Sequence, residues 1–399
     1  MADKEKLIKD RQQTKSPKSK LNKGVILTVG VLLAAVVTSL ISPYEPAEYS
    51  LPPGPQFTGA LAPNTKLQGA ELLLKDQVKG PESLIVEDGT IYAAVEDGRI
   101  LKVVDGKIVK EVILVKNKEC QTPEFRMENT DKCGRPLGLR RLTKNLLICT
   151  DAYLGIITID VEKDKVDVII EGDALVEGTR MQFADDLDLL DENTIIFSDA
   201  STKYRSKTCP YNHIESQPTG RIIQLNLKTK EAKVLLDKIY FPNGVQLFPD
   251  KQSVLVAETE RDRLIRYYLA GPKKGQHEIF FEKLPGSPDN IRLNSRGNFY
   301  VAMAFAKHPD KFQLWDFLGQ YPSIRKLLLQ LIPSSYLGEV HHAFIEKYGL
   351  VVEIDQTGKL VSSLHDPSGT VRFISQVLED EKYIYVASFK QPFIARAKK

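Results

Sequence analysis

A unit of short β-strands separated by turn residues recurs along most of this chain, and it limits the possible folds more than any other feature. The stretch 83–104, SLIVEDGTIYAAVEDGRILKVV, alternates apolar and polar side chains around two Asp-Gly pairs, which is the pattern of antiparallel hairpins. Each unit has an opening strand, a turn, and a second strand that ends in a small or polar residue. Another turn and one or two more strands follow. The openings lie at Glu82, Leu137, Asp185, Asn243, Asp289 and 371–377.

A repeat of about 50 residues with four strands in each unit is typical of a β-propeller. Six openings predict six blades, so we expect residues 67–399 to form an all-β, six-bladed propeller. A long insertion precedes the last opening. Apolar residues of its segment 310–333 have helical spacing, and Pro322 divides the segment. We expect one or two amphipathic helices packed on a propeller face. The alternative is a helical segment that dips into a membrane or gates a substrate.

The chain before the first blade has three sections. Residues 1–23 contain eight lysines and arginines against three acidic residues, and 24–41 is an uncharged apolar run of 18 residues. Such a run is long enough for a transmembrane helix, and the basic flank is expected to stay in the cytoplasm. We therefore predict a single-pass, type II signal anchor, with a cleaved signal peptide as the alternative. Residues 42–66 contain six prolines and are predicted to form an extended stalk.

This topology places the propeller in a lumen or outside the cell, with the anchor in the plasma membrane or the endoplasmic reticulum. Disulfides form in these compartments. Cys120 and Cys133 flank a polar loop and are predicted to pair, whereas Cys149 lies in an apolar run and is predicted to be a buried thiol. The sequence does not place Cys209. The total charge is +3 and the tail holds +5, which leaves −2 for the remainder, so no nucleic acid partner is expected.

Oxygen-bearing side chains stand at the openings of four units. The first strands of all blades line the central channel of a propeller, so their starting residues are expected to meet although they lie far apart in sequence. These residues are Glu82, Asp185, Asn243, Asp289 and Asn290. Ca²⁺ takes about six to eight oxygen ligands, and carboxylates that converge without a cation repel one another. The sequence therefore predicts Ca²⁺ as the cofactor. The alternative is that each residue is an ordinary turn residue.

Other catalytic signatures are missing or incomplete. The sequence has no GxSxG nucleophile elbow, P-loop, dinucleotide fingerprint or zinc motif. Single loop histidines without a neighbouring base or nucleophile are usually solvated, and we expect this of the histidines in the polar segments. They are His213, His308, His341, His342 and His365. Spacing alone does not show whether the adjacent pair, 341–342, lines the mouth of the channel.

Several motifs in order resemble the strictosidine synthase-like propellers. They are GPESL, CGRPLGL, FADDLDLL, FPNGVQL and SPDNIRL, and the resemblance covers residues 57–397. Calcium-binding members of the wider superfamily hold the ion in the channel. Carried over, their ligands fall on the five oxygen-bearing residues named above, with Asp185 where the family usually has Asn. This departure keeps an oxygen donor and adds a negative charge.

The resemblance also implies which activities are absent. Paraoxonases use a histidine pair near the ion, where this chain has Leu137 and Asp151. Strictosidine synthase uses a glutamate in its last blade, where this chain has Ser375, so alkaloid condensation is not expected. The sequence assigns no catalytic residue.

Two functions therefore stay open. The first is a weak hydrolase of aryl esters or lactones, in which Ca²⁺ polarises the carbonyl group; the resemblance favours it. The second is a non-enzymatic adhesion or receptor-like module with structural calcium, which the missing histidine pair favours. The expected partners are the membrane and either a small-molecule ester or an unidentified protein.

Overall fold

The computed structural model describes residues 42–399. The basic tail predicted for 1–23 and the transmembrane anchor predicted for 24–41 lie outside the described residues. Within 42–399, no helix combines the length and the apolar character that crossing a membrane requires.

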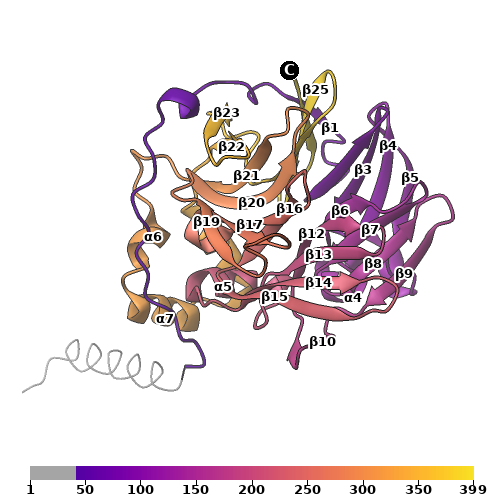
Figure 1. Cartoon of the computed structure of the whole chain (residues 1–399), viewed down its shortest axis with the longest axis horizontal. Helices are drawn as coiled ribbons and strands as arrows, with labels where there is room; N and C mark the ends of the chain where they lie inside the picture. The colour runs from indigo at the N-terminus through magenta and orange to yellow at the C-terminus, as the bar shows by residue number, and fades with distance from the viewer. Residues whose placement is uncertain (1–41) are drawn as a thin grey trace, which may run out of the picture. The chain divides into compact units, whose positions relative to one another are not determined.

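Six four-stranded antiparallel sheets form the framework of residues 42–399 (Figure 1). The first is β2 (Ser83–Glu87), β3 (Thr90–Val95), β4 (Arg99–Val104) and β5 (Lys107–Ile113). The second is β6 (Pro136–Arg141), β7 (Leu146–Asp151), β8 (Gly155–Asp160) and β9 (Lys165–Ile170). The third is β12 (Ala184–Asp191), β13 (Thr194–Asp199), β14 (Gly220–Asn226) and β15 (Ala232–Ile239).

The later sheets repeat this order. The fourth is β16 (Pro242–Leu247), β17 (Ser253–Glu258), β18 (Arg263–Tyr268) and β19 (His277–Phe281). The fifth is β20 (Gly286–Leu293), β21 (Phe299–Ala306), β22 (Gly349–Ile354) and β23 (Leu360–Asp366). The last joins β24 (Ile374–Glu379), β25 (Tyr383–Ser388) and β26 (Ile394–Lys398) to β1 (Glu71–Leu73). A short hairpin, β10 (Leu175–Val176) and β11 (Thr179–Arg180), lies outside the six sheets.

Tight turns join neighbouring strands, as the Asp-Gly pairs predict. Asp88 (φ 47°) and Gly89 (φ 76°) connect β2 to β3, where Glu87 pairs with Thr90. Two successive residues of positive φ are the geometry of a two-residue hairpin turn, which matches the right-handed twist of the strands.

The first strands of the sheets contact one another in a closed series. β2 contacts β6, β6 contacts β12, β12 contacts β16, β16 contacts β20, β20 contacts β24, and β24 contacts β2. β1, the first strand of the described residues, pairs antiparallel with β26 and so completes the last sheet. The prediction of an all-β, propeller-like fold is confirmed.

Apolar side chains fill the spaces between neighbouring sheets. Leu139 and Ile157 of the second sheet, for example, pack with Ala94 and Ile100 of the first. Burying each large apolar side chain stabilises the fold by roughly 1.5–3 kcal/mol. Cys149 is fully buried in the same cluster as a free thiol, as predicted.

Three helices lie between β21 and β22. They are α6 (Leu314–Leu318), α7 (Pro322–Leu331) and α8 (Ser334–Ala343). Pro322 occupies the first turn of α7, where its missing N–H costs no hydrogen bond. Both α7 and α8 contact α5 (Cys209–Glu215), which lies between β13 and β14. Part of the segment predicted as a stalk contacts these helices. Ala47 N donates to Glu215 O, at the end of α5, at 2.9 Å.

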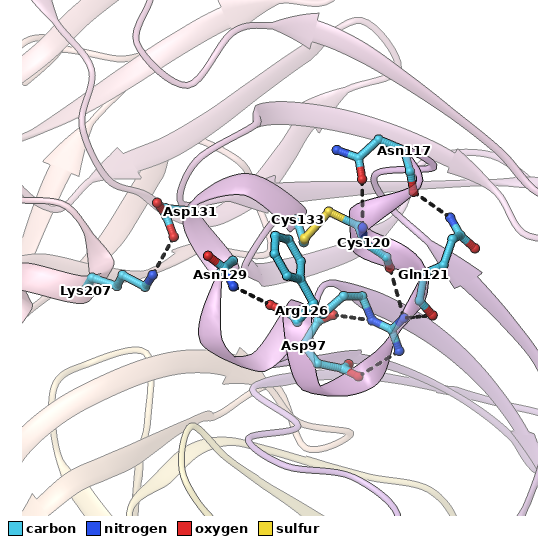
Figure 2. The surroundings of a disulfide bond; sticks show 10 residues. Asp97, Asn117, Cys120, Gln121, Arg126, Asn129, Asp131, Cys133 and Lys207 are labelled. Carbon is cyan, nitrogen blue, oxygen red and sulfur yellow. Dashed lines mark hydrogen bonds and ion pairs between the residues drawn. A yellow bond between two sulfur atoms is a disulfide. The ribbon is translucent and has the colours of Figure 1, made fainter.

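Cys120 and Cys133 form a disulfide, so the predicted pairing is confirmed. Figure 2 shows Arg126 beside this bond, where its guanidinium donates to Cys120 O at 3.1 Å and Gln121 O at 3.0 Å. The same guanidinium pairs with Asp97 at 3.3 Å. The loop is thereby attached to the first sheet. Its short helices are η2 (Glu119–Gln121), α3 (Pro123–Glu128) and α4 (Thr130–Cys133).

Candidate metal centre and adjoining cavity

The side chains predicted to bind a metal lie at the beginnings of first strands in four sheets. Glu82 directly precedes β2, Asp185 lies in β12, Asn243 in β16, and Asp289 and Asn290 in β20. Register shifts at the starts of β12, β16 and β20 mark β-bulges at these residues. A bulge turns a side chain away from the regular alternation of a strand, and bulges are frequent beside functional sites.

Gly244 allows two of these bulges to approach closely. A Cβ at this position would lie 2.5 Å from Asp289 O and 2.6 Å from Ile291 N, too close for any other residue without a shift of the backbone. The glycine therefore keeps Asn243 and Asp289 on adjacent strands within the same small region.

The fold brings the five predicted residues together. Glu82, Asp185, Asn243 and Asp289 line one cavity. Asn290 reaches the same cluster, since its Nδ2 donates to Glu82 Oε1 at 3.0 Å.

Unpaired oxygen atoms are the clearest feature of this cluster. Across residues 42–399, four buried oxygens of the cluster have no hydrogen-bond partner: Glu82 Oε2, Asn243 Oδ1, Asp289 Oδ1 and Asn290 Oδ1. Leaving a buried acceptor unpaired costs roughly 1–3 kcal/mol, and more where the group is charged. A cation is one partner that would satisfy all four oxygens together.

The electrostatics of the three carboxyl groups point the same way. Burial raises the pKa of Glu82 to about 7, with the nearby Asp186 adding to the effect. Burial and the negative charge of Glu82 raise the pKa values of Asp185 and Asp289 well above their usual range. Carboxylates held together in this way repel one another, and a cation removes the repulsion.

Carboxylates alone do not complete a site. In the part of the chain that the structure describes, no group of three or more His, Cys, Asp and Glu side chains is placed to hold a metal ion. A cation held here would also need the amide oxygens of Asn243 and Asn290. A mixed set of carboxylate and amide oxygens is the donor chemistry of a hard cation such as Ca²⁺.

Asp186, the neighbour of Asp185, points into a different environment. It accepts hydrogen bonds from Arg292 at 2.7 and 3.0 Å and from Val245 N at 2.9 Å, and it is fully buried. Arg140 Nη1 lies 3.4 Å from the same carboxylate. This network connects β12 to β6, β16 and β20 and supports the strands that present the unpaired oxygens.

The cavity beside the cluster has a volume of about 330 Å³, which is within the range of small-molecule sites. Aromatic side chains form much of its wall: Phe183, Phe241, Phe305 and Phe389. Arg135 and Lys390 are cationic residues in the lining. A cavity with an apolar wall and many charged and polar side chains suits a small ligand that has both an apolar body and a polar end.

Three histidines, His213, His341 and His342, line this cavity, and the expectation of a solvated side chain is wrong for His341, which is buried. The insertion folds back over α5 and carries the last two into the cavity. Burial, together with the charge on His213, lowers the pKa of His341 well below its usual range. Burial and then Lys390 lower the pKa of His342 to about 4. Both are neutral at physiological pH.

The remaining two histidines lie elsewhere. His365 is fully buried, and its Nδ1 lies 2.7 Å from the Tyr348 hydroxyl, so solvation is wrong here too. His308 is half-buried and packs against Phe57.

Cys209 also lines the cavity, and sequence reasoning did not place it. Its Sγ lies 3.1 Å from His213 Nε2, and His213 Nδ1 lies 3.2 Å from Glu260 Oε1. One signal was present in the segment CPYNH: residues four apart share a helix face, and a proline in second place favours a helix start. The third member, Glu260, comes from a distant segment and carries no such signal.

Comparison with known proteins gives the wider context. The sequence matches the strictosidine synthase family over residues 185–272 and the N-terminal part of strictosidine synthase-like proteins over 59–103. Among solved structures, it is similar to a gluconolactonase from Xanthomonas campestris, with a TM-score of 0.54 and 14% identity over 89% of this chain and 97% of that one. A calcium-binding regucalcin from Agrobacterium tumefaciens gives a TM-score of 0.52 and 12% identity over 82% of this chain and 93% of that one. These two likenesses show the fold.

Curated relatives are much more similar in sequence. Adipocyte plasma membrane-associated protein of Gallus gallus is 37% identical, over 92% of this chain and 87% of its own length. The Homo sapiens protein of the same name is 36% identical, over 93% of this chain and 87% of its own length. On these matches and on its propeller-like fold, the chain belongs to the strictosidine synthase-like family, among the relatives named adipocyte plasma membrane-associated protein.

Proposed function

We propose that this protein is a membrane-anchored, six-bladed β-propeller that binds Ca²⁺ and has weak ester hydrolase activity of the arylesterase or lactonase type. The observation that carries the proposal is the set of four unpaired buried oxygens beside a cavity of about 330 Å³. The gluconolactonase and the calcium-binding regucalcin share the fold, which supports both halves of the proposal.

The residues proposed to hold the ion are Glu82, Asp185, Asn243, Asp289 and Asn290. When bound, Ca²⁺ would supply a Lewis acid that polarises an ester carbonyl. The chain's own residues do the rest. The phenylalanine wall binds the apolar part of an ester and excludes water, and the neutral imidazoles of His341 and His342 are able to accept a proton.

The membrane part of the proposal rests on the sequence and on the relatives. The relatives are named for association with the plasma membrane, and residues 24–41 are uncharged and follow a basic tail. A type II anchor would place the propeller in the lumen of the endoplasmic reticulum or outside the cell. The disulfide between Cys120 and Cys133 suits these oxidising compartments.

One observation favours a second function, a non-enzymatic adhesion or receptor-like module. The unpaired oxygens come from the first strands of different sheets, so an ion bound there would join the sheets of the ring. Calcium would then stabilise the fold, and the cavity or the outer surface would bind an unidentified partner.

Hydrolysis of phenyl acetate by the purified full-length protein in detergent distinguishes the two functions. We expect turnover with Ca²⁺ and its loss in chelator. Calcium at about 100 times its dissociation constant should also stabilise the fold by about 2.7 kcal/mol, which raises Tm by several degrees. Equal rates with Ca²⁺ and with chelator would refute the hydrolase. A rise in Tm with Ca²⁺ but without any turnover would support the non-enzymatic adhesion or receptor-like module.

Asp185→Asn tests the ligand that departs from the family pattern. We expect the variant to bind Ca²⁺ about tenfold more weakly, because an oxygen donor remains while one negative charge is lost. Isothermal titration calorimetry measures the change. Asp188→Asn is the matched control, since the Asp188 carboxylate accepts from Leu247 N and Gln246 Nε2, each at 2.8 Å. Unchanged affinity in Asp185→Asn would show that Asp185 does not face the ion.

A further inference from the structure

Three side chains beside the metal centre form a relay that the proposed function does not use. Cys209 Sγ lies 3.1 Å from His213 Nε2, and His213 Nδ1 lies 3.2 Å from Glu260 Oε1. A thiol beside an imidazole that a carboxylate orients is the arrangement that activates a nucleophile. Both Cys209 and His213 line the same cavity as Asp185, so a ligand bound there would lie beside Cys209, which is half-buried.

Helix α5 positions Cys209 and His213, and its Asn212 also binds the Glu260 carboxylate. Cys209 and His213 lie one turn apart on α5, and Asn212 of the same helix donates to Glu260 Oε1 at 2.7 Å. The Glu260 side chain is only 6% exposed, and its Oε2 has no hydrogen-bond partner within the described part of the chain. The carboxylate is thus fixed with its charge directed at His213.

The disulfide loop fixes the segment that leads into α5. Lys207 Nζ pairs with Asp131 at 2.5 Å (Figure 2), and Lys207 N donates to the Tyr153 hydroxyl at 2.9 Å. Lys207 is two residues before Cys209. The position of the sulfur therefore depends on contacts with the second sheet and with the loop that Cys120 and Cys133 close.

The charges around His213 favour its protonated form. Burial lowers the pKa of His213, but Cys209 and then Glu260 raise it by a larger amount. The net result is a pKa of about 10. Asp185 and the His213 ring also interact electrostatically. His341 stacks on it with a ring separation of 5.6 Å and is itself neutral. A protonated His213 places a cationic hydrogen-bond donor beside the Cys209 sulfur.

We propose that Cys209 is a nucleophilic thiolate, paired with His213 and oriented through Glu260, that accepts an acyl group from a small ester. The choice of an ester rests on the proposed function, whereas the thiolate itself does not. Cys209 and His213 are the catalytic residues in this scheme, and Glu260 is a positioning residue.

The chemistry balances with water as the second substrate. Cys209 Sγ bonds to the carbonyl carbon, the bond from that carbon to the alcohol oxygen breaks, and this oxygen takes the proton from His213 Nε2. A thioester on Cys209 results. Water then adds to the thioester carbon and gives a proton to His213 Nε2. The carbon–sulfur bond breaks, its electron pair returns to sulfur, and the carboxylic acid leaves.

Alkylation by iodoacetamide at pH 6 tests the thiolate in the full-length protein. Cys209 is the free thiol open to reagent, because Cys149 is buried and Cys120 and Cys133 are joined. An unpaired cysteine has a pKa of about 8.5 and reacts slowly at this pH, so we expect His213→Gln to slow labelling by about 10- to 100-fold. Glu260→Gln should slow it about threefold to tenfold by releasing the ring.

A matched variant controls for disturbance of the cavity. Glu339→Gln changes a glutamate in the same lining, whose partner is Lys390. It should not change labelling of Cys209 by more than about twofold, since Glu339 does not contact the relay. Equal labelling of wild type and His213→Gln would overturn the proposal.

Phenyl acetate tests the acyl transfer. Intact mass after an acid quench should show one acetyl group on Cys209 in wild type and none in Cys209→Ser. Absence of the adduct, or wild-type turnover by Cys209→Ser, would overturn the proposal. Measurement in chelator keeps the two proposals apart: acetylation of Cys209 without any calcium dependence of turnover supports the thiolate and refutes the calcium-assisted hydrolase.

Discussion

Replacing Asp186 with alanine is expected to lower the free energy of unfolding by about 3–5 kcal/mol. The Asp186 carboxylate is fully buried and holds both Arg292 and the Val245 N–H. Without it, the buried Arg292 guanidinium would keep Gln376 Oε1, at 2.8 Å, but would lose its negative partner. An uncompensated buried charge is among the most destabilising changes a single substitution makes.

Urea unfolding in saturating Ca²⁺ measures the effect of Asp186→Ala. Asp173→Ala is the control, because Asp173 pairs with Arg180 at 3.6 Å on the surface, where both side chains are more than half exposed. Such a pair contributes less than about 1 kcal/mol. The double variant Asp186→Leu with Arg292→Met should recover much of the loss, since it removes both charges. A loss in Asp186→Ala no larger than in Asp173→Ala would contradict the buried network.

The adjacent acids at 185 and 186 have separate environments at the start of β12. In a regular strand, neighbouring side chains point to opposite faces. The register shift between Ala184 and Leu187 lets Asp185 face the cavity while Asp186 faces the neighbouring first strands. Asp186 supports the backbone of β16 by accepting from Val245 N at 2.9 Å, and Asp188 does the same for Leu247 N at 2.8 Å.

The repeat and the site residues were predictable because both depend on local pattern. Each predicted opening lies at or beside the start of a first strand, as at Leu137 in β6 and Asn243 in β16. Alternating apolar residues and Asp-Gly turns determine these strands locally. Ring geometry then implies that their starting residues meet, even though nothing else in the sequence connects Glu82 with Asn290.

Contacts between distant segments were not predictable. His213 and Glu260 are 47 residues apart, and Arg292 and Asp186 are 106 apart. Neither pair occupies matched places in the repeat, so the repeat does not indicate that they meet. The insertion is a similar case: helical spacing predicts α7, but the return of α8 over the cavity depends on packing against α5.

Asp289→Ala is expected to weaken Ca²⁺ binding by about 100-fold or more, because it removes a charged ligand from the proposed site. The same variant should lose any calcium-dependent ester hydrolysis. In chelator, however, the substitution should not destabilise the fold. Burial, Glu82 and Asp185 raise the pKa of Asp289 well above its usual range, so its ionised form costs folding free energy when no cation is present.

The sign of the stability change therefore separates a metal ligand from an ordinary buried carboxylate. At pH 8 in chelator, Asp289→Ala and Asp289→Asn should melt at or above the wild-type Tm, because each removes a carboxyl group whose ionised form is disfavoured by burial and by repulsion from Glu82 and Asp185. In saturating Ca²⁺ both should melt below wild type, since calcium stabilises them less. An Asp289 that only supports the strand would lower Tm by the same amount in both conditions. Calorimetry with and without Ca²⁺ measures the difference, and equal losses would remove Asp289 from the proposed site.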